Sequence, residues 1–172
     1  DLGLQETDVP FPNGLYGLTK LQGEQAIEAV WEKHFIIRTS WVYSQFGNNF
    51  LKTMLRLASE RTSLSVVSDQ IGTPTYAVDL AEVLLIIITS ETTTFGIYNF
   101  SNEGQCSWYE FAEEIFLQQE IAIDLQAIPT KSYPTPAKRP AYSVLDKSKI
   151  KTTFGVNIKD WKTSLKDCLK HY

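Results

Sequence analysis

Short apolar runs alternate along this chain with segments whose apolar residues recur at helical spacing. A continuous apolar run between helices is typical of a buried parallel strand, and the alternation indicates an α/β fold with a largely parallel sheet. Only about three runs have clear strand character, which is few for a doubly wound sheet, so we expect part of the sheet to be contributed from elsewhere. The strand-like runs are 35–43, 64–67 and 96–100, and helical patterns begin near Gly14, Asn49, Thr75 or Asp79, Ser107 and Asp160.

Three of the expected helices start at residues that cap helices well. Asn49 and Asp160 each precede an apolar helical pattern, and their side chains can accept a hydrogen bond from the first turn. Ser107 and Glu110 have the spacing of a capping box. The segment 129–140 holds four of the seven prolines and is expected to be an ordered loop.

Composition excludes several classes of function. The 172 residues carry a net charge of -4, whereas nucleic-acid modules usually carry a basic excess. The longest apolar run, 83–88, is far too short to span a bilayer, so no membrane partner is expected. Cys106 and Cys168 lack metal-ligand spacing. The two histidines, His34 and His171, are too few and too distant in sequence to predict a metal site. Reduced thiols are the default expectation, with a single disulfide left open.

Tyr16 and Lys20 form the sharpest local pair of chemically active residues. Four positions apart on a helix, they share one face, one turn from each other. A lysine ammonium favours the phenolate of a nearby tyrosine, and such a tyrosine can exchange a proton with a substrate oxygen. Spacing alone is weak evidence, because an exposed tyrosine and a solvated lysine would give the same pattern.

Longer segments around this pair resemble a known family. The segment 16–24, YGLTKLQGE, preceded by Pro10 and Pro12, resembles the active-site helix of the extended short-chain dehydrogenase/reductases. Further segments follow in the order found in one branch of that superfamily, the dTDP-4-dehydrorhamnose reductases, and the resemblance covers nearly the whole chain. They are RTSWVY at 38–43, GNNF at 47–50, DQIGTPT at 69–75, DLA at 79–81, YPTPAKRP at 133–140 and SVLD at 143–146.

The resemblance implies roles for four residues near the cofactor. Tyr16 matches the general acid that protonates the sugar ketone as hydride arrives from the nicotinamide. Lys20 matches the lysine that holds the nicotinamide ribose and tunes the tyrosine. Thr39 and Ser40 lie at the strand end that approaches the nicotinamide in the family, so they are expected cofactor contacts together with Tyr16 and Lys20.

Three further residues are implied to bind the substrate. Trp41 matches an aromatic that lies against the sugar, and a core tryptophan at a strand end is the alternative. Asn49 starts the helix where relatives bind the nucleotide diphosphate, with a plain helix cap as the alternative. Arg139 matches a diphosphate-binding arginine, with an ordinary surface arginine as the alternative. Thr75 stands where some relatives carry another arginine, so no phosphate role is carried to it.

One family feature is absent from the sequence. The glycine-rich turn G-x-x-G-x-x-G that binds the cofactor pyrophosphate does not occur among the nine glycines. We therefore expect the carboxy-terminal portion of a Rossmann-like doubly wound parallel sheet plus a small α/β substrate-binding part, with the main cofactor-binding half outside this chain. Residues 1–47 and 77–102 would be the remainder of the dinucleotide-binding domain, and 48–76 and 103–172 the nucleotide-sugar part.

The implied activity is NADPH-dependent reduction of the 4-keto group of dTDP-4-dehydro-L-rhamnose to dTDP-L-rhamnose, a polysaccharide precursor, in the cytoplasm. NAD is the alternative cofactor, since the residues that choose between them lie outside this sequence. The 172 residues alone are expected to be inactive, and an uncovered sheet edge favours self-association, for example as a homodimer. The alternatives are another nucleotide-sugar epimerase or dehydratase of the superfamily, and a non-catalytic regulatory subunit with the same fold.

Overall fold

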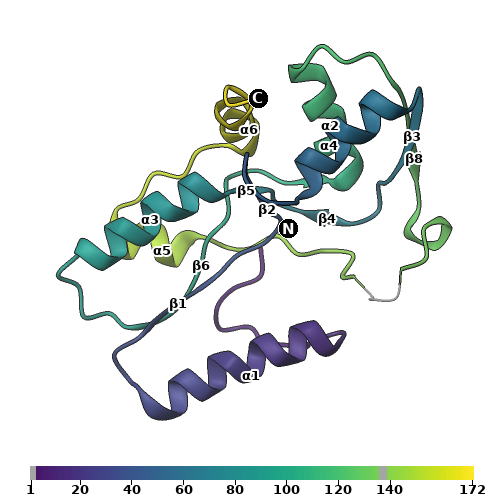
Figure 1. Cartoon of the computed structure of the whole chain (residues 1–172). Coiled ribbons are helices and arrows are strands. Elements are labelled where there is room, and N and C mark those ends of the chain that lie inside the picture. Colours follow the sequence, from purple (N-terminus) through teal and green to yellow (C-terminus); the bar gives the residue numbers. More distant parts are fainter. Residues whose placement is uncertain (1–2, 136–138) are drawn as a thin grey trace.

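The computed structural model describes residues 3–135 and 139–172, which form an α/β structure (Figure 1). The helices are α1 (Leu15–Val30), α2 (Phe50–Glu60), α3 (Ala77–Thr89), α4 (Trp108–Gln118), α5 (Ser148–Phe154) and α6 (Trp161–Leu169), with a 3-10 turn at Thr130–Ser132. The strands are β1 (Phe35–Arg38), β2 (Val42–Tyr43), β3 (Ser63–Val67), β4 (Ile71–Gly72), β5 (Thr75–Tyr76), β6 (Gly96–Asn99), β7 (Cys106–Ser107) and β8 (Asp124–Ile128).

The strands pair in four short ribbons. β1 pairs with β6, β2 with β5 and β3 with β8, all in parallel, while β4 and β7 are antiparallel. Parallel pairing of strands separated by helices confirms the predicted fold class. The expected continuous strand 35–43 is split into β1 and β2, because Trp41 between them has a φ of 48°, a left-handed conformation that no strand accommodates.

Several elements of the structure were not predicted, namely the two-residue strands β4, β5 and β7, the 3-10 turn, β8 and α5. β8 has the sequence DLQAI, whose mixed polar and apolar residues give no clear run, and its pairing with β3 spans about sixty residues of sequence. α5 is only seven residues long and contains a single buried side chain, Ile150. Short elements of this kind depend on tertiary contacts for their stability rather than on local pattern.

The expected helix caps are confirmed. The side chain of Asn49 accepts a hydrogen bond from the backbone N of Lys52 at 3.1 Å. Ser107 and Glu110 make both bonds of the capping box, and Asp160 accepts from the backbone N of Lys162 at 2.9 Å. These bonds satisfy amide groups that the helix itself leaves unpaired, so each start is fixed locally.

Buried side chains gather in two clusters. The larger one joins α2, α4 and α6 over β3 and the β2–β5 ribbon, with Phe111, Ile115 and Leu165 fully buried. The smaller one joins α3 and α5 to the β1–β6 ribbon, centred on Tyr98 and Ile150. Both cysteines lie in the larger cluster as free thiols. In the described part of the chain, no helix combines the length and apolar character needed to cross a membrane.

Helix α1 stands apart from both clusters, below the β1–β6 ribbon in Figure 1. None of its side chains is buried, and Leu15, Ile27 and Val30 are exposed. Its main tie to the ribbon is an ion pair between Glu24 and Arg38 of β1. The helix that carries the Tyr16 and Lys20 pair therefore buries none of its side chains against the described chain.

Candidate active site

Tyr16 and Lys20 lie on one face of the first two turns of α1, as the spacing predicts. The Nζ atom of Lys20 is 5.6 Å from the centroid of the Tyr16 ring, close enough for a cation–π contact. Tyr16 is 77% exposed. Gly17 lets Pro12 pack on the helix start, since a Cβ there would lie 3.1 Å from the Cβ of Pro12. The pair is thus preassembled, and its catalytic role remains a prediction.

Thr39 and Ser40 follow β1 and are tied to the segment that leads into β5. The Ser40 hydroxyl donates to the carbonyl of Thr73 at 3.0 Å, and the Thr39 and Thr75 hydroxyls are 3.4 Å apart. Both hydroxyl oxygens keep an acceptor site. The two bonds hold the end of β1 in a fixed position, while contact with a cofactor stays a prediction.

Trp41 is half-buried and packed against an aromatic neighbour. Its ring lies on that of Trp108, with centroids 3.6 Å apart and planes 12° from parallel, and Trp108 also contacts Phe50. One face of the Trp41 ring is therefore packed against another side chain, as the alternative of a core tryptophan predicts. The residue as a whole is half-buried, and its contact with a sugar stays a prediction.

The side chain of Asn49 makes only local bonds in the described structure. Its oxygen caps α2, and its amide donates to the carbonyl of Ser44 at 2.7 Å and to that of Phe46 at 3.3 Å. Those bonds fix the loop that precedes α2. The first turn of the eleven-residue helix α2 also has backbone amides that can bind an anion. The cap therefore does not test the predicted diphosphate contact.

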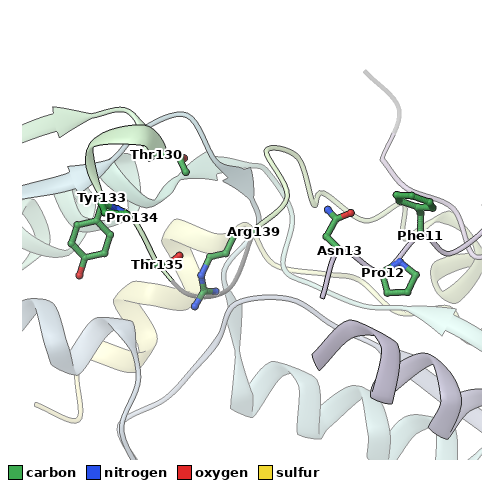
Figure 2. A pocket seen from close by; sticks show the side chains of 8 residues that line it. All are labelled: Phe11, Pro12, Asn13, Thr130, Tyr133, Pro134, Thr135 and Arg139. Carbon is green, nitrogen blue, oxygen red and sulfur yellow. The ribbon is translucent and has the colours of Figure 1, made fainter. Parts of the chain in front are cut away.

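Arg139 lines an open cavity of about 630 Å³ between two loops (Figure 2). One wall is the segment 11–13, which leads directly into α1, and the other holds Thr130, Tyr133, Pro134 and Thr135. Figure 2 shows the Arg139 side chain between Thr135 and Asn13, with its guanidinium on the side of Thr135. Among the residues that the structure describes, the lining includes none of the other predicted site residues.

The far wall of this cavity is anchored by Asp69. Its carboxylate accepts from the backbone N of Thr130 at 2.8 and 3.0 Å and from the Thr130 hydroxyl. The hydrogen bonds from Thr130 lower the pKa of the Asp69 carboxyl, since they favour its charged form. Gln70 donates to the same hydroxyl at 3.0 Å. The DQIGTPT segment thus holds the loop that precedes Arg139.

Three groups near the site were not anticipated from the sequence. Glu24 attaches α1 to Arg38, and its carboxylate raises the pKa of that guanidinium. Trp108 stacks on Trp41. Asp79, within the quoted DLA segment, accepts bonds from Asn102 and Ser164 and pairs with Lys159. Each joins residues far apart in sequence, for which a single sequence gives no signal.

Comparisons with known proteins identify the family of this chain. The sequence model of the family described as RmlD substrate binding domain matches residues 3–172. The dTDP-4-dehydrorhamnose reductase of Aggregatibacter actinomycetemcomitans is 46% identical over 95% of this chain and 59% of its own length. That of Escherichia coli K12 is 40% identical over 98% of this chain and 60% of its own. The chain thus spans about three fifths of the length of these relatives.

Solved structures give the same result. A dTDP-4-dehydrorhamnose reductase from Clostridium acetobutylicum has a TM-score of 0.92 at 40% identity, covering 99% of this chain and 60% of that one. One from Bacillus anthracis, in complex with NADP, has a TM-score of 0.89 at 38% identity, with 98% and 59% covered. A UDP-glucuronic acid 4-epimerase from Bacillus cereus, at 17% identity and a TM-score of 0.83, shares the fold.

The α/β fold with a Tyr and Lys pair on α1 defines a protein of the extended short-chain dehydrogenase/reductase class. Within that class, the match over residues 3–172 is specific. The chain belongs to the RmlD substrate binding domain family.

Proposed function

We propose that this chain supplies the substrate-binding part and the acid pair of a dTDP-4-dehydrorhamnose reductase. The enzyme would reduce the 4-keto group of dTDP-4-dehydro-L-rhamnose with NADPH. The observation that carries the proposal is the contact between the Lys20 ammonium and the Tyr16 ring on an exposed helix face. The relatives at 40–46% identity bear the name of this reductase.

The residues present fit the nicotinamide end of an NADPH molecule. Tyr16 and Lys20 are exposed, so a ribose can reach them, and the oxygens of Thr39 and Ser40 retain acceptor capacity at the end of β1. When bound, the cofactor supplies a hydride to the carbonyl carbon. A relative from Bacillus anthracis was solved with NADP, which favours NADPH over NADH.

Tyr16 would donate its phenolic proton to the ketone oxygen as negative charge develops there. The ammonium of Lys20 would stabilise the negative charge left on the Tyr16 oxygen, because opposite charges attract, and more strongly once bound substrate and cofactor exclude water. Lys20 would also hydrogen-bond the nicotinamide ribose. General acid catalysis of this kind contributes about 10²–10⁴-fold to a rate, so both residues should be necessary for useful turnover.

The nucleotide-sugar would occupy the region between Arg139 and Trp41. Arg139 lines the open cavity beside segment 11–13, and a guanidinium can bind a diphosphate through two parallel hydrogen bonds. Asn49 would present the amino terminus of α2 to the same diphosphate. Trp41 would offer an apolar surface to the deoxysugar. Residues 48–76 and 103–172 would then form the nucleotide-sugar part, and 1–47 and 77–102 the remainder of the dinucleotide-binding domain.

Two wider proposals accompany this function. The free buried thiols of Cys106 and Cys168 suit a reducing compartment, so we infer action in the cytoplasm, in polysaccharide precursor synthesis. A relative from Bacillus subtilis, 41% identical, is named as a spore coat polysaccharide biosynthesis protein. The apolar residues exposed on α1 favour a homodimer, which the mass in solution by light scattering tests.

The function is tested with the polypeptide as the organism makes it. Mixed with NADPH and dTDP-4-dehydro-L-rhamnose, it should oxidise NADPH and release dTDP-L-rhamnose, identified by mass spectrometry and NMR. A 4-keto sugar linked to UDP should be a poor substrate. Epimerisation without net consumption of NADPH would indicate another superfamily enzyme instead. Binding of a partner protein without turnover would indicate a regulatory subunit.

A further inference from the structure

Two tryptophans from distant segments form a closely stacked pair. Trp41 lies between β1 and β2, and Trp108 is the first residue of α4. Their ring centroids are 3.6 Å apart and their planes 12° from parallel. Phe50 also contacts Trp108, with ring centroids 4.7 Å apart. Aromatic contacts of this kind restrict the orientation of both rings.

The backbone of Trp41 needs such support. Its φ of 48° is uncommon for a residue with a side chain, and residues in this region keep their conformation only where neighbours hold them. The backbone N of Thr75 donates to the Trp41 carbonyl at 3.1 Å, which fixes the chain. The direction of the ring is then set by what the ring touches.

Gly72 provides the second surface for the ring. A Cβ at this position would lie 2.6 Å from Cε2 of Trp41 and 2.8 Å from Oγ of Ser143, so only glycine lets the indole approach β4. β4 pairs with β7, which ends immediately before Trp108. Its residue Ile71 also bonds to segment 141–143, which follows Arg139. The ring of Trp41 therefore rests on the same ribbon that places Trp108 and the chain after Arg139.

We propose that Trp108 is a positioning residue that sets the orientation in which Trp41 meets the sugar of the bound nucleotide. Trp108 covers one face of the Trp41 indole and Gly72 lies against its Cε2 and Cζ2 atoms, so the sugar meets the part of the ring that neither residue covers. Gly72 is the complementary element, because the absence of a side chain there leaves room for the ring. This inference rests on the proposed function, in which Trp41 contacts the sugar.

Binding of dTDP-L-rhamnose, the product, is the first test, measured by calorimetry on the polypeptide as the organism makes it. Trp108→Ala should weaken binding about tenfold, as expected for loss of one well-packed aromatic contact. Trp108→Phe should keep most of the affinity, because a ring remains to stack. Trp31→Ala, at the exposed end of α1, is the matched control and should leave binding unchanged.

A double-variant cycle separates positioning from general stability. If Trp108 acts through Trp41, Trp108→Ala should cause no further loss in a Trp41→Ala background. Each of Trp41→Ala and Trp108→Ala should also abolish the exciton-coupled circular dichroism signal of the stacked pair. Additive losses of affinity across the cycle would overturn the positioning role.

The outcomes distinguish this inference from the function it rests on. A wild-type protein that does not bind dTDP-L-rhamnose overturns both. Tight binding by the wild type and equally tight binding by a folded Trp108→Ala variant overturns the positioning role alone. If Trp108→Ala does not fold, Trp108→Leu compared with Trp108→Phe gives the same comparison, with the aromatic variant expected to bind more tightly.

Discussion

The carboxylate of Glu24 on α1 and the guanidinium of Arg38 on β1 form a forked ion pair. Nη2 lies 2.6 Å from Oε2, and Nε lies 2.9 Å from Oε1. Forked pairs of this kind fix geometry as well as charge. Because α1 has no buried side chain, this pair decides how the helix that carries Tyr16 sits on the β1–β6 ribbon.

Glu24→Ala should therefore loosen α1. Loss of one partner leaves the other partly buried without its counter-charge, which costs about 1–3 kcal/mol. Compared with the wild type, Glu24→Ala should show faster amide hydrogen exchange within α1 and a lower free energy of unfolding in urea. Glu60→Ala, which removes the exposed pair with Arg56, is the control and should cost under about 0.5 kcal/mol. Equal exchange in the two variants would contradict the role of Glu24.

Asp79 should be the most destabilising carboxylate to remove. It is buried, accepts from Asn102 at 2.7 Å and from Ser164, and pairs with Lys159 at 3.2 Å. Asp79→Ala would leave the Asn102 amide and the Ser164 hydroxyl buried without this acceptor, at a cost of about 1–3 kcal/mol for each unsatisfied donor. Urea unfolding measures this, with the exposed Asp124 replaced by Ala as control. A loss no larger than that of the control would show that the network contributes little.

Much of the fold could be predicted from local sequence pattern, whereas the contacts of Glu24 and Asp79 could not. The caps at Asn49, Ser107 and Asp160 involve only residues within three positions of each other, so the starts of three helices were predictable. The break at Trp41 was not, because its left-handed backbone depends on contacts with Trp108 and segment 72–75. The pairing of β3 with β8 likewise needs the folded chain.

The candidate site divides in the same way. Helical spacing places Lys20 over Tyr16, and the contact between them was predictable from four residues of separation. The role expected of Arg139 came only from the resemblance, and its position beside segment 11–13 was not predicted, since the two segments are far apart in sequence. The contacts of Asp69 with Thr130 and of Glu24 with Arg38 position these segments. They join residues distant in sequence, so they could not be predicted from it.

Arg139→Ala should raise the KM for the nucleotide sugar. Hydrogen bonds to a charged group contribute about 1.5–3 kcal/mol, which corresponds to a rise of about 10–100-fold. The KM for NADPH should stay unchanged. Arg139→Lys should recover only part of the affinity, because an ammonium cannot form the forked contact. Arg56→Ala is the control, and an unaltered KM in Arg139→Ala would exclude a role in diphosphate binding.

Cys168 should make stability fall at alkaline pH. Burial raises the pKa of its thiol from 9.0 to about 11. Between these values the folded protein keeps a proton that the unfolded chain releases, so the free energy of unfolding decreases as pH rises from about 9 through 11. The full contribution is on the order of 2–3 kcal/mol. Urea unfolding at several pH values should show a shallower decline in Cys168→Ala, and identical slopes would contradict the shift.

The most direct measurement is the rate of NADPH oxidation by Tyr16→Phe with dTDP-4-dehydro-L-rhamnose, beside Tyr109→Phe as a control that also loses one exposed tyrosine hydroxyl. Removal of the Tyr16 proton donor should lower kcat by about 10²–10⁴-fold while affinity for dTDP-L-rhamnose is retained. Tyr109→Phe should turn over like the wild type. A Tyr16→Phe protein that reduces the ketone at the wild-type rate would contradict the assignment of Tyr16 as the acid.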